Sequence, residues 1–135
     1  MSITGFPEPA VADLTIGPAR PANSVVLAPM SGVTDIVFRR IAARLGAGMV
    51  VSEMVACAEF VRADEESRLR AEGSGLDLHV VQLAGRDPAW IGEAARLAVA
   101  AGADVVDLTW AARPRRSWAA MGARRCSRTS TSRPG

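Results

Sequence analysis

The stretch LHVVQLAGRDPAWIGEAARLAVAAGADVVDL, residues 78–108, decides the fold, because it reads as a strand, a helix and a second strand. Leu78–Leu83 is a short apolar run of the length of a buried strand. Asp87 followed by Pro88 is typical of a helix N-cap with proline at the first helical position, and the helical pattern runs to Ala101. Gly102 then ends the helix, and Val105–Leu108 begins the next strand.

The same alternation occurs upstream. Val25–Ala28 is an apolar run, and Asp35–Leu45 has apolar residues at helical spacing. Met49–Met54 is a second apolar run, followed by a helical stretch near Ala56–Arg62. The charged segment Arg62–Glu72 is predicted to be solvated surface.

Four apolar strands that begin near residues 25, 49, 78 and 105, with three helices between them, predict an α/β fold with a parallel sheet. This suits either the N-terminal half of a TIM (β/α)8 barrel or an open doubly wound sheet, and periodicity does not choose between them. Residues 1–22 are a proline-rich irregular leader, 23–108 form the domain, and 109–135 have no apolar period and are predicted to be a disordered tail.

Charge is divided unevenly along the chain. All sixteen basic residues are Arg; residues 1–109 carry nine of them against fourteen acids, while 110–135 carry seven and no acid. Such a tail is typical of RNA binding through phosphate contacts. Cys57 and Cys126 have neither the number nor the spacing of a disulfide framework or a zinc site. With no export signal and no 18-residue apolar run, we expect a cytoplasmic protein without a membrane span or a metal.

Three strings at the expected strand ends carry a family resemblance. The first runs from Leu27 to Asp35, Leu-Ala-Pro-Met-Ser-Gly-Val-Thr-Asp, and is followed by Phe38-Arg39. The second is Val51-Ser52-Glu53-Met54, and the third is Val81-Gln82-Leu83-Ala84-Gly85. Together they resemble the tRNA-dihydrouridine synthases over roughly residues 14–108. The resemblance implies a β/α barrel that holds FMN, takes NADPH as reductant and reduces uridine in tRNA, its partner.

The resemblance also implies the site. Pro29, Met30 and Ser31 would contact the flavin, because proline fixes a turn close to a flat ring and methionine offers it a polarizable surface. Gln82 would bind the ring edge, since its amide both donates and accepts. Without the surrounding strings, Pro29 and Met30 would more simply be a strand-end kink and a core methionine, and Gln82 a buried amide bonded to backbone.

Neighbouring polar residues have plainer interpretations. Glu53 has two possible roles, a site carboxylate or a structural carboxylate paired with an Arg such as Arg39 or Arg40. Thr34 and Asp35 are predicted to cap the helix that follows them. His79 begins a strand, away from the expected catalytic end, so it is predicted to be a core or surface residue. Cys57 is predicted to be a small packing residue.

The resemblance ends abruptly after Leu108. There the family carries Asn-Met-Gly-Cys-Pro, whose Cys donates a proton to the uracil, whereas this chain reads Thr109-Trp110-Ala111-Ala112-Arg113. Written as AAC ATG GGC TGC CCG, the family string becomes Thr-Trp-Ala-Ala-Arg when one A is removed. We therefore expect residues 109–135 to be out of frame, and the chain as written to be an inactive fragment.

Two other functions remain open from the sequence. One is a noncatalytic RNA-binding protein that uses the Arg-rich tail, which predicts a steep salt dependence. The other is a different FMN-dependent barrel oxidoreductase, against which the Gly32-Val33-Thr34-Asp35 string with Phe38-Arg39 argues.

Overall fold

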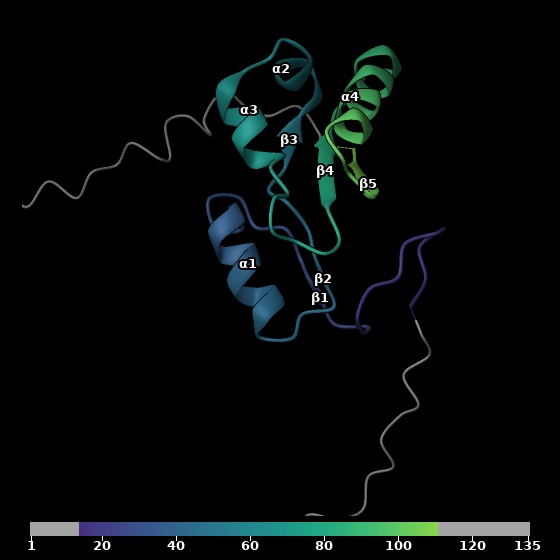
Figure 1. Cartoon of the computed structure of the whole chain (residues 1–135). Helices are drawn as coiled ribbons and strands as arrows, with labels where there is room; N and C mark the ends of the chain where they lie inside the picture. The colour runs from purple at the N-terminus through teal and green to yellow at the C-terminus, as the bar shows by residue number, and fades with distance from the viewer. Residues whose placement is uncertain (1–13, 111–135) are drawn as a thin grey trace, which may run out of the picture.

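A computed structural model describes residues 14–110, and Figure 1 shows its strands lined by helices. The described chain contains five strands and four helices: β1 (Val26–Leu27), α1 (Ile36–Arg44), β2 (Met49–Val50), β3 (Val55–Ala56), α2 (Cys57–Val61), α3 (Glu65–Arg70), β4 (Val80–Ala84), α4 (Pro88–Ala100) and β5 (Val105–Thr109). The predicted α/β class is confirmed. The segment predicted to be out of frame, residues 109–135, lies outside the described residues apart from Thr109 and Trp110.

All strand pairs are parallel and follow chain order. β1 pairs with β2, and β3, β4 and β5 lie side by side in that order. A single bridge between Val51 and Val80 connects the end of β2 to β4. A doubly wound sheet would place a later strand on the far side of β1, so this strictly sequential order is that of half a barrel.

β2 and β3 are two parts of one strand separated by a bulge. Val51 lies opposite Val80, and Val55 lies opposite Leu83, so four steps along this strand match three along β4. The extra residue lies within 52–54, and it bends the strand and interrupts its pairing. The four strands predicted from the sequence are therefore present, with the second one divided.

The helix boundaries follow the predicted caps. The carboxylate of Asp35 accepts a hydrogen bond from the amide of Phe38, and that of Asp87 accepts one from Ala89. Pro88 occupies the first turn of α4, and Gly102 leaves the helix at a φ of 92°, which favours glycine. Thr34, also predicted as a cap, instead bonds within the preceding loop.

The core lies between β3–β4 and the helices α2 and α4. Alternation along β4 turns Val81 and Leu83 towards the helices, where they pack with Cys57, Phe60, Ala94 and Ala98. Gln82 lies on the other face of the strand. The guanidinium of Arg62, at the end of α2, stacks 5.1 Å from the ring centre of Trp90 in α4.

The segment Arg62–Glu72 is mostly exposed, as predicted, and α3 forms within it. The carboxylate of Asp64 caps this helix by accepting a hydrogen bond from the Ser67 amide. The strand predicted to begin at Val105 is β5, whose last residue, Thr109, pairs with Ala84. Within residues 14–110, no helix is long and apolar enough to cross a membrane.

Candidate functional site

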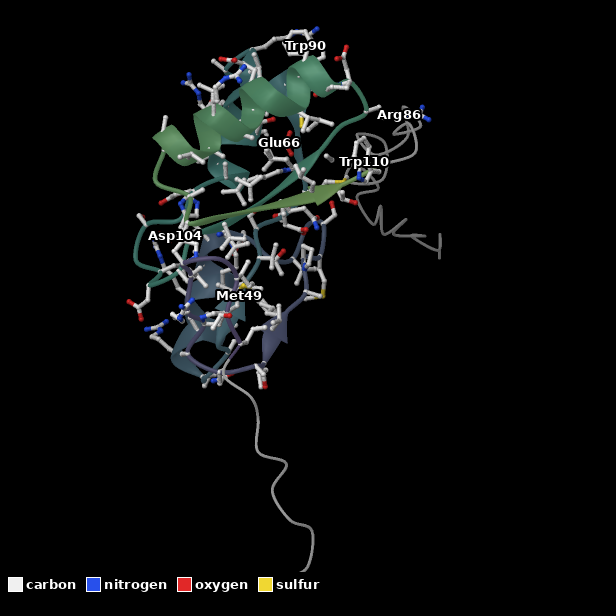
Figure 2. The ribbon with its side chains drawn as sticks, turned by 90° about the vertical axis from the view of Figure 1, so that its right-hand side faces the viewer. Met49, Glu66, Arg86, Trp90, Asp104 and Trp110 are labelled. Carbon is white, nitrogen blue, oxygen red and sulfur yellow. The ribbon has the colours of Figure 1, made fainter. Side chains whose placement is uncertain are left out.

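Three of the predicted site residues follow the end of a parallel strand, and the fourth lies in the middle of another. Pro29, Met30 and Ser31 follow β1 in the loop to α1, and Gln82 lies on β4. Figure 2 shows Asp104 and Trp110 at opposite ends of β5, with Arg86, just past β4, at the Trp110 end. The three loop residues are brought together on one loop. Gln82 is separated from them by the β2–β3 strand, and no hydrogen bond joins it to the loop.

The β1–α1 loop is closed on itself by hydrogen bonds. The Met30 carbonyl accepts from the amides of Val33 and Thr34, at 3.1 and 3.0 Å. The Thr34 hydroxyl accepts from the Met30 amide at 3.0 Å and donates to the Met30 carbonyl at 3.1 Å. Gly32, at a φ of 74°, allows the tight turn between them. The backbone is thus held while the Met30 side chain remains 39% exposed.

Gln82 is oriented by a residue that the sequence reasoning missed. Its side-chain amide donates to Oδ2 of Asp107 at 2.6 Å, because Gln82 and Asp107 are register partners on β4 and β5. Its backbone amide donates to the hydroxyl of Ser52. The side-chain carbonyl oxygen of Gln82 accepts no hydrogen bond from any described residue, so the side-chain amide can present an acceptor to a ligand. The sequence signal that could have identified this partner is Asp107 itself, an acidic residue inside the apolar run Val105–Leu108.

Glu53 contacts the loop directly. It is buried, and its Oε2 accepts a hydrogen bond of 2.8 Å from the Gly32 amide. The ion pair considered from the sequence exists, but its partner is neither Arg39 nor Arg40: it is Arg70 of α3, whose Nε lies 3.9 Å from the same oxygen. Sequence patterns did not identify Arg70 as the partner, because they do not reveal how the bulge in 52–54 directs the Glu53 side chain.

Arg39 is fully buried and bonds only to backbone. Its Nε donates to the Thr34 carbonyl at 3.1 Å, and Nη2 donates to the carbonyls of Arg70 and Glu72 at 3.3 and 2.7 Å. Burial lowers the pKa of Arg39, while the nearby carboxylates of Glu72, Asp35 and Glu53 oppose this. Nη1 is buried without a partner among the described residues. Arg39 therefore connects the loop to the end of α3.

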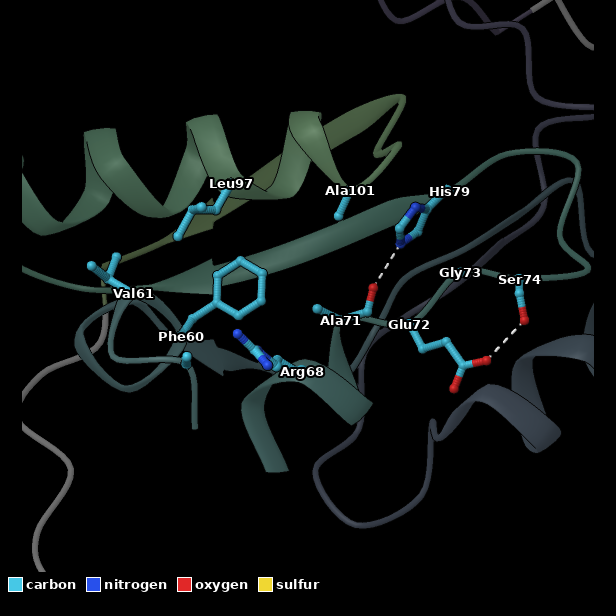
Figure 3. Close-up of a pocket in the computed structure, with 11 residues that line it drawn as sticks. Phe60, Val61, Arg68, Ala71, Glu72, Gly73, Ser74, His79, Leu97 and Ala101 are labelled. Atoms are coloured by element: carbon cyan, nitrogen blue, oxygen red, sulfur yellow. Dashed lines mark hydrogen bonds between the residues drawn. The ribbon is translucent and has the colours of Figure 1, made fainter. Parts of the chain in front are cut away.

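A separate cavity of the described chain lies away from this loop. It has a volume of about 540 Å³ and is lined by residues of α2, α3, the start of β4 and the end of α4. Figure 3 shows His79 there, its Nε2 bonded to the Ala71 carbonyl at 2.7 Å, which confirms a structural histidine. Because β4 begins at this cavity, it is at the opposite end of the sheet from the loop. A smaller hollow of about 310 Å³ borders Gly32, Glu53 and Arg70.

Cys57 carries a free thiol, a group that can act as a nucleophile when it is ionised and accessible. It is buried against the core, and this burial raises the pKa of its thiol. A neutral, buried thiol is a packing residue, as predicted. Among residues 14–110, no three His, Cys, Asp or Glu side chains are grouped to hold a metal ion.

Comparison with known proteins places these residues in one family. A family model described as "Dihydrouridine synthase (Dus)" matches residues 26–110. A "Probable tRNA-dihydrouridine synthase" of Rhizobium leguminosarum is 55% identical over 86 residues, covering 64% of this chain and 27% of the relative. "tRNA-dihydrouridine synthase B" of Pseudomonas aeruginosa is 49% identical over 94 residues, covering 69% and 28%. The chain spans less than a third of these relatives, and no solved structure matched it.

Proposed function

Because the chain belongs to the dihydrouridine synthase family, we propose that residues 26–110 are the flavin-binding half-barrel of an enzyme that reduces uridine in tRNA. The hydrogen-bonded loop after β1, which holds the exposed Met30 in place, is the observation that carries this proposal. FMN would supply hydride to the uracil when bound, with NADPH as the reductant that restores it.

The proposed flavin contacts fit the chemistry of an isoalloxazine ring. Pro29 and Met30 offer it an apolar surface, and the loop backbone that presents them is held at both Met30 and Gly32. Ser31 lies exposed between them. Gln82 offers its free carbonyl oxygen to the polar edge of the ring, while Asp107 holds the amide nitrogen. These four residues are the flavin site that we propose.

We propose that the chain as written has no synthase turnover. The family resemblance implies Asn-Met-Gly-Cys-Pro after the fourth strand, whereas here Thr109 begins the corresponding string and Ala112 stands where the proton-donating Cys is expected. Cys57 does not substitute for it, because it is buried in the core and burial raises its pKa. A one-base deletion at the Thr109 codon accounts for both the missing Cys and the Arg-rich segment.

The phosphate of FMN has no partner among the four residues proposed for the flavin site. In barrels of this class, the loops after the seventh and eighth strands usually bind the phosphate. The proposed contacts from residues 29–31 and 82 involve only the ring. We therefore expect riboflavin, which lacks the phosphate, to bind this chain within about threefold of FMN, since each tenfold difference would require 1.4 kcal/mol from contacts to the phosphate.

Saturation-transfer NMR with millimolar riboflavin or FMN tests the proposal, because it detects weak binding. We expect transfer to the ring protons that Gln82→Leu reduces and that Arg96→Leu, an exposed change on α4, leaves unaltered. Absence of transfer from the unmodified chain would refute flavin binding by these residues. Turnover of tRNA uridine with NADPH by the purified chain would refute the proposed inactivity.

A further inference from the structure

The buried carboxylate of Glu53 has no role in the flavin site described so far. It lies within the bulge that separates β2 from β3, and its Oε2 accepts the Gly32 amide at 2.8 Å. A buried carboxylate needs a partner of opposite charge or several donors. Here the loop amide and the Nε of Arg70 are both within reach of the same oxygen.

A closed set of contacts runs from the loop to α3 and back. Thr34 bonds twice to the Met30 backbone, and the Thr34 carbonyl accepts from Arg39. Arg39 also donates to the carbonyl of Arg70, whose own guanidinium faces Glu53. Glu53 then accepts from Gly32, on the same loop. Each member contacts the next, so these contacts support the loop backbone without a ligand.

We propose that Glu53 is a positioning residue that latches the β1–α1 loop through the Gly32 amide, with Arg39 and Arg70 holding the latch in place. The loop's task as a flavin surface rests on the function proposed above. The latch itself rests only on contacts within the chain. A preorganised backbone lowers the entropic cost of binding. The latch would therefore strengthen the binding of a flat ring that lies against the exposed Met30 side chain.

Arg70 supplies a matched control. Glu66 also pairs with Arg70, but it is exposed on α3 and accepts no hydrogen bond from the loop within the described residues. Glu53→Ala and Glu66→Ala therefore each remove one carboxylate partner of the same guanidinium. Only the first removes the acceptor of the Gly32 amide. Glu53→Gln retains an acceptor oxygen and removes the charge.

Amide hydrogen exchange, resolved by NMR, measures the latch. In Glu53→Ala we expect Gly32 to exchange about ten- to a hundredfold faster, with Val81 in β4 unchanged, because a hydrogen bond to a charged group is lost locally. Glu53→Gln restores most of the protection, and Glu66→Ala leaves Gly32 within about twofold. Unchanged Gly32 exchange in Glu53→Ala, with Val81 still protected, would overturn the proposal.

A second measurement needs no variant and decides the matter if Glu53→Ala fails to fold. Scalar coupling across the hydrogen bond is expected between the Gly32 nitrogen and the Glu53 carboxyl carbon of the unmodified chain. The Phe38 amide, which donates to the Asp35 carboxylate at 2.8 Å, is the positive control. Coupling at Phe38 without coupling at Gly32 would refute the latch. Failure of riboflavin to bind would instead refute the flavin site and leave the latch standing.

Discussion

Replacing Arg39 with Met should destabilise the fold more than any surface change. The side chain is fully buried, and three backbone carbonyls, those of Thr34, Arg70 and Glu72, accept from it. Hydrogen bonds to a charged group contribute about 1.5–3 kcal/mol each. Removing a charge that is costly to bury offsets part of this, as the lowered pKa of Arg39 indicates. We expect a net loss of about 3–5 kcal/mol.

Urea unfolding followed by circular dichroism measures this loss. Domains of this size have total stabilities of about 5–15 kcal/mol, so Arg39→Met should shift the midpoint strongly or unfold the chain. The stability of Arg39→Lys should lie between those of the unmodified chain and Arg39→Met, because a single ammonium does not reproduce the planar guanidinium and its several donors. Arg44→Met, an exposed change on the same helix, should cost less than about 0.5 kcal/mol. A loss below about 1 kcal/mol for Arg39→Met would refute the role assigned to Arg39.

Three further outcomes are expected. Leu83→Ala, in the core, should cost about 2–5 kcal/mol in the same urea assay, and a loss below 1 kcal/mol would place Leu83 outside the core. Burial raises the pKa of the Cys57 thiol, so its neutral form stabilises the fold fully below the unfolded thiol pKa of about 8.5, and this stability is lost as pH rises through the folded pKa. Cys57→Ala should therefore flatten the alkaline decline of the urea midpoint. An unchanged decline would contradict this reasoning. Removing residues 111–135 should abolish any salt-dependent RNA binding, and retained binding would assign it to the half-barrel.

The elements could be predicted because their signals are local. The caps Asp35 and Asp87, the stop at Gly102 and the apolar runs each depend on a few neighbouring residues, and the structure places them as expected. The parallel class followed from strands that are apolar throughout. The family strings then fixed the barrel rather than the doubly wound alternative, which periodicity had left open.

The contacts around the site could not be predicted in this way. The Gln82–Asp107 bond needs the register of β4 against β5, and a shift of one residue would place the two side chains on opposite faces. The bulge at 52–54 depends on the same register, and it directs Glu53 to Gly32 and Arg70. Arg39 lies in an amphipathic helix where arginine is ordinarily solvated, and only the position of α3 buries it.

Resequencing the gene from the codon for Leu108 through several hundred bases beyond the present stop is the most direct test of the proposed function. We predict that synthase sequence continues downstream in the frame reached by restoring one base, beginning with Asn-Met-Gly-Cys-Pro in place of residues 109–113. If that base is found in the gene, the chain derives from an active synthase; if the deletion is confirmed, the locus encodes an inactive fragment. The absence of synthase sequence in every downstream frame would contradict the frame change.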